Sequence, residues 1–133
     1  MRQIKYEQPK VIIHDNGNVE LAEFWYITYG PMLIIIPRGF ISDGNSVPWL
    51  FSRMVPKFGK NTLAGIVHDW LYKTGSPCDD PESIDLTQKF ADQVRLHICV
   101  KCSVPWYQRT LSYIALRLFG GFAWCKHRRG KKC

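Results

Sequence analysis

Strand-like and helix-like patterns occupy separate parts of this chain, and their order limits the folds open to it. Residues 11–36 hold short β-branched and aromatic runs broken by turn residues, whereas residues 61–121 repeat apolar side chains at helical spacing. Strands followed by helices are typical of the α+β class. With 133 residues, 46% of them hydrophobic, the chain can bury one core. We therefore predict a single α+β domain over residues 1–125 and a basic C-terminal tail over residues 126–133.

The N-terminal part predicts a small antiparallel β-sheet. Two pairs of strands are expected, each joined by a turn: the first turn is Asp15-Asn16-Gly17-Asn18 and the second contains Gly30-Pro31. The four predicted strands are residues 11–14, 19–22, 24–29 and 32–36.

A structured loop and three helices are predicted to follow. Residues 38–60 combine glycine and proline breakers with large apolar side chains, which favours a loop packed on its neighbours. Asn61 or Thr62 can cap the first helix. The predicted helices run from there to about Tyr72, from about Ser83 to Cys99, and from Ser103 to Gly120-Gly121.

The formal charge of +7 is concentrated near the C-terminus. Five of the 18 cationic residues lie in residues 126–132. The rest of the chain has 13 cationic and 11 acidic residues, so its charges nearly balance. A basic tail of this kind can bind nucleic acid, anionic lipid or an acidic partner, but it is more often solvated and without a partner. No interior basic stripe with interleaved aromatics occurs, so no specific nucleic-acid binding is expected. Aromatics near Arg109 and Arg117 suit a membrane interface, a protein interface or a core equally.

Five cysteines, an odd number, leave at least one thiol free or in an intermolecular bond. Cys99 and Cys102 have zinc-knuckle spacing, and Cys125 with His127 could complete a tetrahedral site. Because this second half has no recognised spacing, we do not expect zinc at Cys99 and Cys102. Free thiols in a reducing cytosol are the preferred interpretation.

His68, Asp69 and Tyr72 are the residues where chemistry is most favoured. They place a general base, a hard-metal ligand and a hydroxyl in one apolar, helix-compatible segment. His68 and Tyr72 share a helix face, whereas Asp69 points about 100° away, so a proton-transfer partner for His68 must come from elsewhere. Asp92 could return on the second helix to meet the imidazole. The helical wheel opposes this contact, because Asp92 lies roughly opposite the apolar stripe of its helix.

The same residues have a purely structural interpretation of equal weight. The His-Asp pair can be a satisfied polar island, with Asp69 capping a loop and Tyr72 bonding a backbone carbonyl. A glycine-rich phosphate loop, a serine nucleophile elbow and a zinc-protease motif are all absent from the sequence.

Four segments, in order, resemble the domain of unknown function 1353 family of phages and prophages. They are Ile36–Pro48, His68–Tyr72, Ala91–Asp92 and Leu116–Gly120, and the resemblance covers about residues 20 to 124. It implies a phage origin but no reaction.

The His-Asp-x-x-Tyr segment also resembles the active-site helix of secreted and parvoviral phospholipases A2. In those enzymes the His activates water, the Asp binds calcium, a later Asp orients the His, and a glycine-containing loop completes the calcium site. The resemblance implies His68 as base, Asp92 as its orienting partner, Tyr72 as a third site residue, and calcium held by Asp69, Asp43, Gly44 and Asn45.

Three functions stay open at this point. The first is a calcium-assisted hydrolase of phospholipase A2 type that acts at the cell envelope during phage entry or lysis. The others are a metal-dependent peptidoglycan hydrolase and a non-catalytic virion, tail or assembly component. Expected partners are a phospholipid or cell-envelope surface, or other virion proteins. The N-terminus lacks a signal-peptide pattern and no apolar stretch reaches the ~20 residues of a spanning helix, so we expect synthesis in the host cytoplasm, with the virion as a further location.

Overall fold

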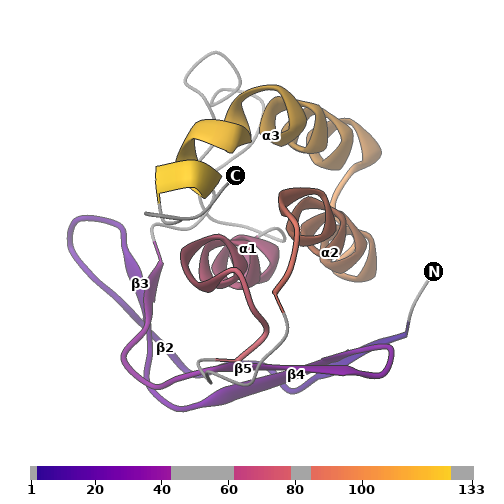
Figure 1. The fold of residues 1–133 in the computed structure, drawn as a ribbon. Helices are drawn as coiled ribbons and strands as arrows, with labels where there is room; N and C mark the ends of the chain where they lie inside the picture. Colours follow the sequence, from indigo (N-terminus) through magenta and orange to yellow (C-terminus); the bar gives the residue numbers. More distant parts are fainter. Residues whose placement is uncertain (1–2, 43–61, 79–84, 127–133) are drawn as a thin grey trace.

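The computed structural model describes residues 3–42, 62–78 and 85–126, and in these ranges strands come first and helices follow (Figure 1). The elements are β1 Ile4–Tyr6, β2 Val11–Ile13, β3 Val19–Leu21, β4 Trp25–Tyr29, β5 Met32–Ile36, β6 Ile41–Ser42, α1 Thr62–Thr74, α2 Gln88–Lys101 and α3 Trp106–Lys126. The predicted α+β class is therefore confirmed. The predicted loop falls largely in residues 43–61, outside the described residues, as do the basic residues 127–133.

The strands form two three-stranded antiparallel sheets where the sequence predicted one. The orders are β1-β4-β5 and β2-β3-β6. Both predicted hairpins are confirmed, β2 with β3 and β4 with β5. Strands β1 and β6 were not predicted, because three and two residues are too few to show a strand pattern.

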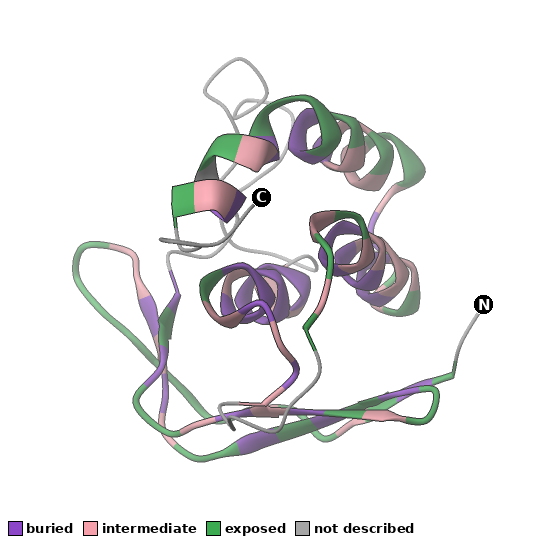
Figure 2. Cartoon of the chain, viewed as in Figure 1, coloured by how far each residue is buried: buried purple, intermediate pink, exposed green. Residues whose placement is uncertain are grey.

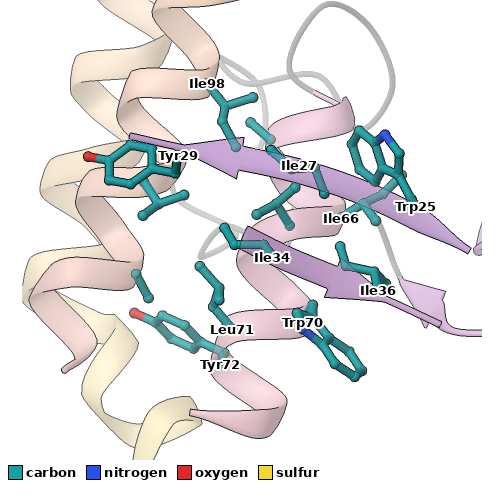
Figure 3. Packing of buried hydrophobic residues seen from close by; sticks show 14 of the residues in the cluster. Trp25, Ile27, Tyr29, Ile34, Ile36, Ile66, Trp70, Leu71, Tyr72 and Ile98 are labelled. Atoms are coloured by element: carbon teal, nitrogen blue, oxygen red, sulfur yellow. The ribbon is translucent and has the colours of Figure 1, made fainter. Parts of the chain in front are cut away.

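Alternation along β4 explains how the first sheet supports the helices. Trp25, Ile27 and Tyr29 are buried, while Tyr26 between them is exposed. Figure 3 shows the inward side chains of β4 and β5 facing α1. Ile34 and Ile66 are fully buried there. Each such aliphatic side chain contributes about 1.5–3 kcal/mol by leaving water, so this contact anchors α1 firmly to the sheet.

The three helices form two further layers above the sheets. In Figure 1, α1 and α2 lie between the strands and α3. Figure 2 shows α1 as largely buried, in contrast to the outer side of α3, which is exposed. Among the described residues, no helix is long and apolar enough to cross a membrane.

The second helix starts later than predicted. Thr87 is its N-cap, with extended backbone, and the side-chain oxygen of Thr87 accepts a hydrogen bond of 3.1 Å from the backbone N–H of Phe90. Asp85 and Leu86 precede the helix, so the predicted start near Ser83 is wrong. The first helix ends as predicted, a little beyond Tyr72, at a Gly75 in left-handed conformation (φ 68°).

The third helix continues through the glycine pair that was predicted to end it. It runs to Lys126, and Gly120 is buried within it. A Cβ atom on Gly120 would lie 2.6 Å from the hydroxyl oxygen of Tyr72. The glycine is thus explained by close packing against α1 and not by a helix end. The predicted start at Ser103 is also wrong, because that residue has a positive φ of 59° and the helix begins after Pro105.

Candidate functional site

A buried carboxylate, that of Asp92 on α2, joins the three helices. Its exposed fraction is 0%. Oδ1 lies 2.9 Å from His68 Nε2 and 2.6 Å from the hydroxyl of Tyr72, both on α1. Oδ2 lies 2.9 Å from a guanidinium nitrogen of Arg117 on α3. One carboxylate therefore receives donors from both neighbouring helices.

The two donors from α1 are placed by helical spacing. His68 and Tyr72 are four residues apart, so their rings project from one face, as predicted. The ring centroids are 4.0 Å apart with planes tilted by 40°. Each residue is only 6% exposed. The helix thus presents an imidazole nitrogen and a phenol hydroxyl together to the same oxygen of Asp92.

The helical-wheel argument against Asp92 is wrong. It assumed one apolar contact face on α2, but this helix is covered from more than one direction. Phe90 packs edge-on against Tyr29 of β4 at 5.6 Å, while Asp92 faces α1 and α3. The buried residues of α2 accordingly occupy more than one stripe: Ala91, Asp92, Val94, Arg95, Ile98 and Cys99.

Asp92 is held ionised in spite of its burial. Desolvation alone would raise the pKa of the carboxyl, but hydrogen bonds from His68, Tyr72 and Arg117 outweigh it and bring the pKa below its ordinary value. A carboxylate can only accept hydrogen bonds, so His68 donates through Nε2–H. In the neutral imidazole this tautomer puts the lone pair on Nδ1, which is the atom that could act as a base.

Tyr72 serves as a donor in this cluster. Burial, and then the hydrogen bond to the Asp92 carboxylate, raise the pKa of the phenol far above its ordinary value. The hydroxyl therefore keeps its proton. Its ring packs edge-on against Trp124 of α3, with centroids 5.2 Å apart, which links α1 and α3 directly.

Tyr72→Phe is expected to lower the free energy of unfolding by about 1.5 kcal/mol, because it removes one charge-assisted hydrogen bond and leaves the ring packing in place. The pKa of Asp92 should rise toward its ordinary value, since one of the groups that lower it is lost. Urea unfolding and an NMR titration of the carboxyl would measure the two effects. An unchanged unfolding curve would contradict the assigned hydrogen bond.

Asp69, the predicted metal ligand, points to a different neighbour. Its Oδ2 accepts a hydrogen bond of 2.5 Å from the hydroxyl of Ser42, the buried last residue of β6. The predicted companions Asp43, Gly44 and Asn45 lie outside the described residues. Because Ser42 directly precedes them, the contact brings Asp69 to the point where that segment begins. Their role as calcium ligands stays a prediction.

In the described ranges, no three His, Cys, Asp or Glu side chains gather closely enough to hold a metal ion. Calcium could still take backbone carbonyl and water ligands besides Asp69, since its coordination sphere needs six to eight oxygens.

The sequence reasoning missed two contact residues, Arg117 at Asp92 and Ser42 at Asp69. Arg117 had been weighed only as a cation beside aromatics, although it stands in the Leu116–Gly120 segment that carries the family resemblance. Its spacing offered a signal: Arg117 and Gly120, three apart, share a face of α3, and both contact the cluster. Ser42 likewise stands in a segment of the family resemblance, Ile36–Pro48.

Within the described ranges, the cysteines form no group that could hold a metal ion. Cys78, Cys99 and Cys102 are free thiols, and Cys102 lies 3.1 Å from the hydroxyl of Tyr6. Cys125 is disulfide-bonded, so the interpretation that the cysteines are free thiols is wrong for this residue.

The fold and the cluster define an α+β domain in which a buried His-Asp-Arg network connects three helices. The chain belongs to the family described as "Protein of unknown function (DUF1353)", whose model matches residues 20–116. The predicted family is thereby confirmed. The match includes His68, Tyr72 and Asp92 and ends directly before Arg117. Neither a curated protein nor a solved structure matches the chain.

Proposed function

We propose that this protein is a small phage-encoded hydrolase of phospholipase A2 type that cleaves phospholipid esters at the cell envelope. The observation that carries the proposal is the 2.9 Å contact between His68 Nε2 and the buried Asp92 carboxylate. A histidine whose one ring nitrogen is fixed by a carboxylate is poised to take a proton at the other.

The cluster supports a simple hydrolytic cycle. Nδ1 of His68 accepts a proton from a water molecule as the water oxygen attacks the ester carbonyl. The resulting imidazolium is stabilised by Asp92, to which Nε2–H donates. His68 then gives the proton to the departing alcohol oxygen as the ester bond breaks, which restores the neutral imidazole.

Tyr72 and Arg117 act in this scheme as positioning residues. Tyr72 holds Oδ1, and Arg117 holds Oδ2 and balances the negative charge in the resting state. The carboxylate plane is therefore fixed at both oxygens, and with it the direction of the imidazole.

Calcium, when bound, would polarise the ester carbonyl. Asp69 follows His68 in α1, is partly exposed, and accepts a hydrogen bond from Ser42, directly before the other predicted calcium ligands. Together with Asp43, Gly44 and Asn45 it would supply hard oxygen ligands of the kind that calcium prefers.

The test is calcium-dependent release of fatty acid from phospholipid vesicles. His68→Ala is expected to reduce the rate at least about 100-fold, the usual effect of removing a general base. A chelator should lower the wild-type rate as well. His14→Ala is a matched control, because His14 is also paired with a carboxylate, Glu20, but lies on the exposed β2–β3 turn. Equal, background release by wild type and His68→Ala would refute the proposal.

A second function, a non-catalytic virion, tail or assembly component, is favoured by one observation. Asp92 has donors on both oxygens within the protein, which is what a purely structural polar cluster requires. In that case His68→Ala impairs folding or assembly and wild type shows no turnover. Mass spectrometry of purified particles is the direct test, because absence from virions excludes this function. Release of muropeptides from cell walls would instead identify a peptidoglycan hydrolase.

A further inference from the structure

The outer face of α3 carries large apolar side chains that take no part in the core. Ile114, Leu118 and Phe122 follow one another at four-residue spacing and are 44%, 67% and 85% exposed. Figure 2 shows this side of α3 as exposed, facing away from α1 and α2. We propose that this outer face docks on an anionic phospholipid surface.

The opposite face of the same helix is fully used in packing. Ser112, Leu116 and Trp124 are buried, and Gly120 contacts Tyr72. At 100° per residue, Ile114, Leu118 and Phe122 fall within an arc of roughly 80° on the outer side. The helix thus has two separate apolar faces. Packing in the core explains one of these faces. The other exposes three large apolar side chains side by side, and such a face marks an interaction surface.

The charge distribution identifies the kind of partner. All 11 acidic residues lie at or before Asp92, whereas nine of the 18 cationic residues follow it. Residues 93–133 are therefore entirely free of acidic side chains, and α3 itself carries Arg109, Arg117 and Lys126. An exposed apolar face on a helix whose charged side chains are all cationic suits an anionic headgroup layer.

A second copy of the chain is a poorer partner for this face. Two copies joined through α3 would bring like charges together, which opposes association. The aromatic content of the helix agrees with a lipid surface. Tyr107, 45% exposed and seven residues before Ile114, extends the outer face at its N-terminal end, and such side chains favour the headgroup level of a bilayer.

Arg117 connects this surface to the buried cluster. Its side chain is 36% exposed, yet a guanidinium nitrogen reaches Asp92 Oδ2 at 2.9 Å. Docking through α3 would therefore bring lipid close to the cluster. The docking proposal does not depend on the proposed hydrolase activity, because docking requires that the chain binds lipid but not that it cleaves lipid.

The experiment is co-sedimentation of the full chain with vesicles of phosphatidylglycerol or of phosphatidylcholine. We expect binding to phosphatidylglycerol that weakens as salt is added, and much weaker binding to phosphatidylcholine. The double variant Leu118→Asp/Phe122→Asp should reduce binding to phosphatidylglycerol at least tenfold, because it removes two inserted side chains and adds repulsion. Both positions are exposed, so circular dichroism should show an intact fold. Ile13→Asp, at a 66% exposed apolar position on β2, is the matched control and should bind as wild type does.

Three results would overturn the docking proposal. The first is that wild type fails to bind phosphatidylglycerol vesicles at low salt. The second is that wild type and the double variant bind these vesicles equally well. The third is that light scattering shows wild type as a dimer and the double variant as a monomer. His68→Ala keeps the outer face intact and should bind vesicles normally. A chain that binds lipid but releases no fatty acid therefore refutes only the hydrolase.

Discussion

Replacement of Asp92 by asparagine is expected to lower the free energy of unfolding by about 3 kcal/mol, at the low end for a broken buried ion pair. The amide has nearly the same shape, so packing is kept while the charge is lost. Arg117 then loses its counter-charge. Because its side chain is partly exposed, water can solvate the guanidinium, which limits the loss in the free energy of unfolding. Urea unfolding followed by tryptophan fluorescence measures the change.

Glu20→Gln is the control for this variant. Glu20 is paired with His14 near the surface, and such pairs contribute about 0–1 kcal/mol. If Asp92→Asn were no more harmful than Glu20→Gln, the ion pair would not stabilise the three-helix arrangement.

The Asp92 carboxyl also predicts how stability depends on pH. Its pKa in the folded state lies below the ordinary value of 3.8, so the unfolded chain binds the proton more readily. The stabilisation is present above pH 3.8 and is lost as the pH falls through the lower, folded-state pKa. In acid titrations, wild type should lose stability in this range, and Asp92→Asn should lose less.

Gly120→Ala is expected to lower the free energy of unfolding by about 2 kcal/mol, although alanine is the better helix former. The added methyl would lie 2.6 Å from the Tyr72 hydroxyl and 3.1 Å from the side-chain nitrogen of Gln88. The hydroxyl ends a rigid ring and is bonded to Asp92, so it cannot move aside without breaking that bond. Thermal unfolding would show the loss.

The neighbouring glycine provides a matched control. Among the residues that the structure describes, a Cβ at Gly121 would meet only a Gln88 side-chain oxygen, at 3.7 Å, an ordinary contact. Gly121→Ala should therefore stabilise the protein by about 0.5–1 kcal/mol through helix propensity. In a Tyr72→Phe background the clash at residue 120 is relieved, so Gly120→Ala should cost less there. Equal effects of the two glycine substitutions in wild type would contradict the close contact.

Much of the fold could be predicted from local patterns. β-Branched and aromatic runs separated by turn residues identified the two hairpins, and apolar periodicity identified the three helices. Helix ends were less predictable, because they depend on contacts that a sequence does not display. The start of α2 is set by the Thr87 cap, and the continuation of α3 past Gly120 follows from its contact with Tyr72.

The candidate site was predictable only in part for a related reason. Helical spacing placed His68 and Tyr72 on one face, and the structure brings Asp92 of α2 to His68. The helical wheel failed for Asp92 because it treats a helix as having one inner face, whereas α2 contacts a sheet and two helices. Arg117 joins the cluster from α3; its three-residue spacing from Gly120 indicates a shared helix face but does not identify Asp92 as the partner.

The placement of Asp92 also limits how the helices can slide against one another. Apolar helix faces often have alternative packings, one turn apart, that bury nearly the same surface. A displacement of α1 by one turn, about 5.4 Å, would carry both His68 and Tyr72 out of hydrogen-bond reach of Oδ1. A comparable displacement of α3 would separate the Arg117 guanidinium from the Asp92 carboxylate and break their ion pair. The buried carboxylate thus makes one alignment of the three helices distinctly more favourable than its neighbours, and the geometry around His68 is selected together with that alignment.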